Sequence, residues 1–89
     1  MIMTLVAVRD RVAKRWSHPI PVESVDAFKR DFALALSKMD DSETLKACRE
    51  DYDVYAFGVF DDTASHSEQP LRTNAFPEFC FSLDQLEVK

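Results

Sequence analysis

The segment 51–62 constrains the fold more than any other part of the chain. Apolar side chains occupy both sets of alternate positions in it. One set holds Tyr52, Val54, Ala56, Gly58 and Phe60, and the other holds Tyr55, Phe57 and Val59. A strand that is apolar on both faces is typical of the interior of a sheet. The pattern therefore predicts a strand that is central or covered on both sides, and the glycine inside it predicts a bulge or a close approach of two backbones.

Three further extended segments accompany this strand. Segment 1–10 fits a period-two strand with apolar residues on both faces, one of which turns cationic at Arg9, and segment 76–83 carries Phe79, Phe81 and Leu83 in alternation. Segment 14–22 contains two prolines, which have no N–H to donate, so it is expected as an irregular strand or arm at a sheet edge. A hairpin turn near residues 10–13 would join it to the first strand.

The clearest helix is expected over 24–39, where apolar residues recur every three or four positions and Ser24 can cap the first turn. A short second helix is expected over 42–50 with Ser42 as its N-cap, and residues 61–71 are expected to form a loop. Residues 84–89 are expected to be a charged tail or a single helical turn. The fold class is therefore α+β: a small domain over 1–89 with about four antiparallel strands packed against one main helix, in the order strand, strand, helix, short helix, strand, strand.

Composition excludes several classes of protein. No apolar run approaches the roughly 20 residues that a membrane-spanning helix needs. Cys48 and Cys80 have no metal-binding spacing, so they are expected as reduced thiols in a reducing compartment. Because the chain has one glycine, a glycine-rich phosphate-binding loop is not expected.

Catalytic and metal-binding patterns are weak. His18 and His66 form no recognisable arrangement with either cysteine, so we expect no enzyme, no metal and no cofactor. Four aspartates flank the central strand and could hold a cation or act as acid and base, although turn-forming acids are the favoured interpretation. They are Asp51, Asp53, Asp61 and Asp62.

The charge of the chain is unevenly distributed. The net charge is −5, which by itself argues against nucleic acid as a partner. Residues 1–30 nevertheless carry six Lys or Arg against three acids, while residues 31–89 carry five against thirteen. This asymmetry favours a polar partner on one side of the molecule, although ordinary surface charge would also produce it.

One stretch combines cations with the single tryptophan, and it is the candidate binding site. Basic grooves follow the phosphates of single-stranded nucleic acid, and aromatic rings stack its bases. A β-ribbon with both elements is a candidate binding arm, whereas a solvated hairpin with its indole folded onto the core is the alternative. The candidate nucleic-acid-binding residues are Arg9, Arg11, Lys14, Arg15 and Trp16, with Lys29 and Arg30 as an extension.

Two motifs resemble a family of phage proteins. The stretch 8–13, followed by Pro19 and a helix rich in Phe, resembles the opening of the small non-structural protein of microviruses, in the gokushovirus branch of single-stranded-DNA phages. The acidic and aromatic stretch 51–62, which ends in Gly-x-Phe-Asp-Asp, is similar to the second motif of that family. The resemblance covers roughly residues 3–62 and departs after them, where Thr63-Ala64-Ser65 replaces a glycine-containing turn.

This resemblance implies a non-enzymatic factor that acts on the phage genome in the cytoplasm of a bacterial host, with Arg9 and Arg11 at the matching cationic positions. The leading hypothesis is therefore an accessory protein that binds single-stranded DNA during replication or packaging, with a homodimer as a further possibility. The rival hypothesis is an interaction module whose acidic part and aromatic segment 76–83 contact a host or capsid protein, as an acidic mimic of DNA could.

Overall fold

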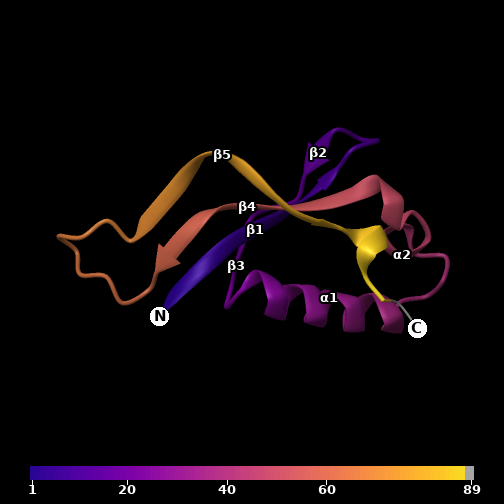
Figure 1. The fold of residues 1–89 in the computed structure, drawn as a ribbon, viewed down its shortest axis with the longest axis horizontal. Helices are drawn as coiled ribbons and strands as arrows, with labels where there is room; N and C mark the ends of the chain where they lie inside the picture. Colours follow the sequence, from indigo (N-terminus) through magenta and orange to yellow (C-terminus); the bar gives the residue numbers. More distant parts are fainter. Residues whose placement is uncertain (88–89) are drawn as a thin grey trace.

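The fold is a five-stranded antiparallel sheet with one main helix, described for residues 1–87 in a computed structural model (Figure 1). The strands are β1 (Ile2–Asp10), β2 (Arg15–Trp16), β3 (Ile20–Val22), β4 (Tyr52–Asp61) and β5 (Leu71–Ser82). Their order is β2-β1-β4-β5, and β3 also pairs with β1. The expected α+β class and the central position of the strand at 51–62 are thereby confirmed.

The expected arm at 14–22 divides into two short strands. Both pair with β1: Trp16 lies opposite Arg9, and Ile20 lies opposite Val6. The residues between them include Pro19, which has no N–H to contribute to a ladder. The sheet therefore has five strands, where about four were expected. The last strand is also longer than expected, because it begins at Leu71 instead of residue 76.

A bulge in β4 changes which side chains share a face. Leu5 pairs with Gly58 and Val6 pairs with Ala56, so Phe57 has no partner in β1. One inserted residue reverses the facing of every residue beyond it. The expectation that Gly58 and Phe60 share a face with Ala56 is therefore wrong, whereas the bulge expected at the glycine is confirmed.

Gly58 also permits a close approach to β5. Its φ is +153°, and a Cβ built on it would lie 2.0 Å from the carbonyl oxygen of Arg72. Only a residue without a side chain can occupy this position without displacing the neighbouring backbone. The absence of a side chain at Gly58 therefore allows β4 and β5 to lie close together at the point where their register shifts.

The helix α1 (Val25–Lys38) begins where the sequence predicts. The hydroxyl of Ser24 accepts a hydrogen bond from the N–H of Ala27 at 3.1 Å, and Asp26 lies in the first turn. Both features stabilise the amino end of a helix. The buried face of α1 centres on Leu36, which has no exposed surface.

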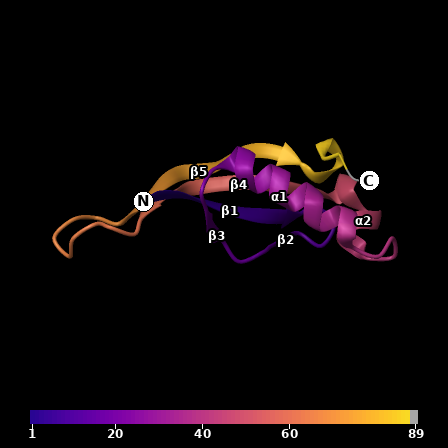
Figure 2. The same cartoon turned by 90° about the horizontal axis from the view of Figure 1, so that it is seen from below.

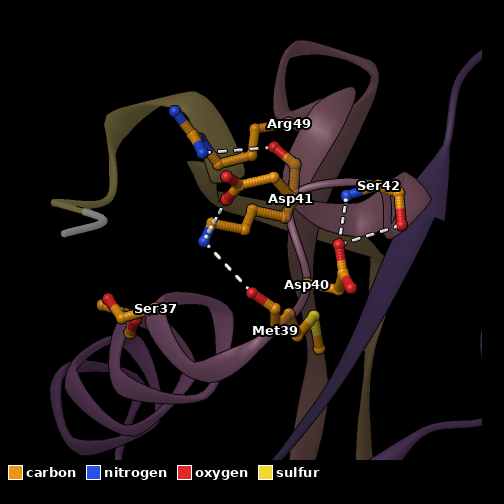
Figure 3. A network of polar contacts seen from close by, with 8 residues as sticks. Ser37, Met39, Asp40, Asp41, Ser42 and Arg49 are labelled. Carbon is orange, nitrogen blue, oxygen red and sulfur yellow. Dashed lines mark hydrogen bonds and ion pairs between the residues drawn. The ribbon is translucent and has the colours of Figure 1, made fainter.

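The second helix, α2 (Thr44–Ala47), is shorter than expected and is followed by a 3₁₀ turn, Arg49–Asp51. Its N-cap is Glu43, so the expected capping role of Ser42 is wrong. The N–H and hydroxyl of Ser42 both donate to one carboxylate oxygen of Asp40 at 3.0 Å, which closes the turn before the helix (Figure 3). The Ser42 hydroxyl therefore stabilises the turn instead of the helix.

The core lies between α1 and one face of the sheet. It consists of Val6, Leu36, Val54, Ala56, Phe81, Leu83 and Leu86. Figure 2 shows α1 along this face, and no helix of the described residues covers the opposite face. We call that opposite side the open face of the sheet.

Candidate nucleic-acid interface

The hairpin between β1 and β2 carries the cationic segment and has an ordered turn. A carboxylate oxygen of Asp10 accepts hydrogen bonds from the N–H groups of Val12 and Ala13, both at 3.0 Å. Lys14 closes the turn with a φ of +58°, in the left-handed region. This arrangement holds residues 11–16 in a defined shape, and all of them are exposed.

Trp16 lies partly exposed on the open face. Its ring centroid is 5.2 Å from the ring of Tyr55 and 5.1 Å from the ring of Phe57, and both contacts are T-shaped. The guanidinium of Arg9 lies 5.2 Å from the centre of the indole, which is a cation–π distance. With 42% of its surface exposed, Trp16 is supported by its neighbours without being enclosed by them.

The cations of the hairpin differ in their pairing. Arg11 Nε lies 3.3 Å from a carboxylate oxygen of Asp53, so its charge is offset by a neighbour. Within residues 1–87, no carboxylate lies at ion-pair distance from Arg9, Lys14 or Arg15. Arg15 pairs with Asp10 in the ladder, so it projects to the other side of the ribbon from Trp16.

Lys29 and Arg30 do not join this group. The ammonium of Lys29 lies 5.5 Å from the centre of the Phe81 ring, which belongs to the core face. Arg30 pairs with Asp31 at 3.4 Å, where both side chains are well exposed. Because α1 packs on the core face, these two cations lie across the sheet from Trp16. The seven candidate residues therefore do not form one continuous strip.

The structure adds aromatic residues that the sequence analysis did not include in the site. Trp16, Tyr55 and Phe79 come from three different strands, and the Tyr55 and Phe79 centroids are 5.7 Å apart. Trp16 reaches Tyr55 across β1, where the small residue Ala7 lies opposite Tyr55. We name Trp16, Tyr55, Phe57 and Phe79 the ring row. The alternation of Tyr55 and Phe57 along β4 was the only signal in the sequence that pointed to it.

The aspartates at the ends of β4 belong to turns and ion pairs. A carboxylate oxygen of Asp61 accepts from the hydroxyl of Thr63 at 2.8 Å and from its N–H at 3.0 Å, and these bonds lower the Asp61 pKa. Asp53 faces Arg11, and Asp62 pairs with the terminal amine of Met1 at 2.7 Å. Within residues 1–87, no three His, Cys, Asp or Glu side chains gather as a metal site would require.

Other candidate groups are dispersed. Cys48 and Cys80 are both free thiols, and burial raises the pKa of Cys80.

In the segment 76–83, Phe76 and Phe79 are exposed, whereas Phe81 is a core residue, so only part of this segment is available to a partner. No helix among the described residues is both long and apolar enough to cross a membrane.

Comparison with known proteins gives one match. The model of a protein family described as Phage ORF5 protein matches residues 3–75. This match extends past Asp62, where the resemblance noted in the sequence was expected to end. No curated protein and no solved structure matches the chain.

Proposed function

The chain belongs to the Phage ORF5 protein family, and on this premise we propose that it is a non-enzymatic factor that binds single-stranded DNA. It is a phage accessory protein. The phage would be a microvirus of the gokushovirus type, and the protein would act on its genome in the cytoplasm of the bacterial host, during replication or packaging.

The observation that carries this proposal is the partly exposed Trp16 beside the guanidinium of Arg9. An exposed indole can stack a base, and the neighbouring cation can contact the adjoining phosphate. Lys14 on the same hairpin adds a charge that no carboxylate of the described residues offsets at short range, whereas Arg15, also unpaired, projects to the other side of the ribbon. We therefore place the interface on the hairpin and leave Lys29 and Arg30 outside it.

The net charge of −5 opposes binding at long range, so the interaction depends on these local cations. Their field is screened within about 10 Å at 0.1 M salt. Contacts with about three phosphates of a single strand would give a slope of about −2 for log affinity against log salt concentration. Binding is therefore expected to be strongest at low ionic strength.

The test is fluorescence anisotropy of a labelled oligo-dT, titrated with the protein at several salt concentrations. We expect Arg9→Gln and Lys14→Gln each to weaken binding and to reduce the salt slope by about 0.7. Arg30→Gln is the matched control, because it removes the same charge from the other side of the sheet. Equal losses in all three variants would mean that only net charge matters, and no binding at low salt would refute the proposal.

Trp16→Ala tests the stacking part separately. Stacking a base on an aromatic ring contributes roughly 1–3 kcal/mol, so we expect a loss of that size with an unchanged salt slope. Circular dichroism of the variant checks that the sheet is retained. A variant that folds and binds oligo-dT as tightly as the parent protein would contradict a stacking role for Trp16.

A further inference from the structure

The open face of the sheet carries the ring row across its whole width. Trp16 comes from β2, Tyr55 and Phe57 from β4, and Phe79 from β5. The centroid separations are 5.1 Å to 5.7 Å. The aromatic side chains therefore form a continuous line that begins at the cationic hairpin and ends at the far edge strand.

Trp16 and Phe79 remain exposed although they touch neighbouring rings, whereas Tyr55 and Phe57 are partly buried. The three contacts are T-shaped, with interplanar angles of 71°, 71° and 77°. In a T-shaped pair, one ring keeps both of its faces clear of its partner and the other ring has one face covered, and Arg9 also lies over one face of Trp16. Phe79 is 52% exposed and Trp16 is 42% exposed, so flat ligands can reach both ends of the row.

The charges beside the ring row indicate the kind of partner that fits this surface. Arg9 lies against Trp16 at one end of the row, and Lys14 extends the positive charge into the turn. The carboxylate of Asp53, on the same strand as Tyr55, is offset by Arg11 at 3.3 Å. A partner with a negative backbone and flat apolar groups at regular intervals matches this combination, and a single nucleic-acid strand has that chemistry.

We propose that the ring row is a base-stacking platform that distinguishes unpaired DNA from duplex DNA. Unpaired bases have free faces that can stack on Trp16, Tyr55 and Phe79, whereas bases in a duplex are already stacked on one another. This inference rests on the proposed function and adds three residues to it: Tyr55, Phe57 and Phe79. The strand would cross β1, β4 and β5 from the hairpin toward Phe79.

The experiment uses the intrinsic emission of Trp16, because the chain contains a single tryptophan. Three probes of equal length are titrated: oligo-dT, an abasic oligodeoxynucleotide with the same phosphates, and a duplex. We expect oligo-dT to quench the emission and to bind at least about fivefold more tightly than the abasic probe, since one stacked base gives a factor of that size or more. The duplex is expected to bind no better than the abasic probe.

Phe79→Leu is the decisive variant, because leucine keeps an apolar side chain but cannot stack a base. It is expected to lose about fivefold or more in affinity for oligo-dT and to leave the abasic probe unaffected. Phe76→Leu is the matched control on the same strand, because Phe76 is 82% exposed and makes no ring contact within residues 1–87. It is expected to bind like the parent protein.

Three results would overturn the inference, and they are distinguishable. Equal, salt-dependent binding of oligo-dT and the abasic probe would leave DNA binding intact and remove the stacking platform. The absence of binding to any probe at low salt would refute the proposed function as well. A dimer in sedimentation that Phe79→Leu dissociates, with unchanged affinity for oligo-dT, would assign the open face to a second copy of the chain.

Discussion

Arg11 and Asp53 form an ion pair that joins the β1–β2 turn to β4, with 3.3 Å between Nε and the carboxylate oxygen. The Asp53 side chain is 10% exposed and the Arg11 side chain is 54% exposed. Without the ion pair, water would still solvate the Arg11 guanidinium but would hardly reach the Asp53 carboxylate. The N–H of Arg11 also donates to the carbonyl of Asp51 at 2.9 Å. The contacts of Arg11 therefore help to hold the cationic hairpin against β4, in addition to the β1–β4 ladder.

Arg11→Ala is expected to reduce the free energy of unfolding by about 1–3 kcal/mol, because it leaves a nearly buried carboxylate without its partner. Urea denaturation measures the change. Lys14→Ala is the control, since an exposed cation without such a contact should alter stability by less than about 0.5 kcal/mol. In a double-mutant cycle, Arg11→Ala combined with Asp53→Asn should cost less than the sum of the two single changes, and strict additivity would show that the pair is not coupled.

Gly58→Ala is expected to destabilise the sheet by about 2 kcal/mol or more. The substitution puts a Cβ 2.0 Å from the Arg72 carbonyl oxygen and requires a φ of +153° that other residues rarely adopt. The shift in thermal midpoint relative to Asn74→Ala, an exposed change on β5, gives the measurement. A Gly58→Ala protein as stable as the parent would mean that β4 and β5 do not approach this closely.

Ser24→Ala is expected to cost about 1 kcal/mol, because the N–H of Ala27 loses its acceptor at the start of α1. Ser24→Asp is the conservative control, since a carboxylate accepts the same hydrogen bond and also interacts favourably with the helix dipole. The free energies of unfolding of both variants are compared at neutral pH. A loss in the aspartate variant equal to that in the alanine variant would argue against capping.

Stability is expected to fall in acid because three turn aspartates have lowered pKa values. The N–H and hydroxyl of Ser42 lower the Asp40 pKa, the ammonium of Lys46 at 2.8 Å lowers that of Asp41, and Thr63 lowers that of Asp61 (Figure 3 for the first two). A carboxyl with a lowered folded pKa stabilises the fold fully above its ordinary value of 3.8. That contribution disappears as the pH falls through the folded pKa.

The measurement is the urea midpoint between about pH 6 and about pH 2, where these carboxyls become protonated. Asp40→Asn and Asp61→Asn should each reduce the dependence of the midpoint on pH. Asp84→Asn is the control, because Asp84 lies in a different segment, the 3₁₀ turn Leu83–Gln85. Identical pH profiles for the parent protein and both variants would contradict the role of these turns.

Much of the fold could be predicted from the residues in order. Apolar spacing and Ser24 located α1 to within one residue at each end, and the two apolar faces of segment 51–62 placed β4 inside the sheet. The errors arose where two local preferences compete. Ser42 can cap a helix or close a turn, and it closes the turn because its N–H and hydroxyl both donate to the carboxylate of Asp40.

The candidate site was predicted only in part. Arg9, Arg11, Lys14, Arg15 and Trp16 are close in the sequence, so one hairpin holds them together. The hypothesis that Lys29 and Arg30 extend the group depended on how α1 packs, and the helix places them on the other side of the sheet. The ring row was not predicted, because Trp16, Tyr55 and Phe79 are far apart in the chain.

The sequence by itself determined the helix, its cap and the cationic hairpin, because each depends on interactions between residues a few positions apart. It also indicated the central strand, through the two apolar faces of segment 51–62. The tertiary structure alone decided which rings meet on the open face. That outcome requires the register of β1 with β4, the small side chain of Ala7 between Trp16 and Tyr55, and the bulge at Phe57. A shift of one residue in the register would turn these rings to the opposite face, and no local pattern encodes that choice.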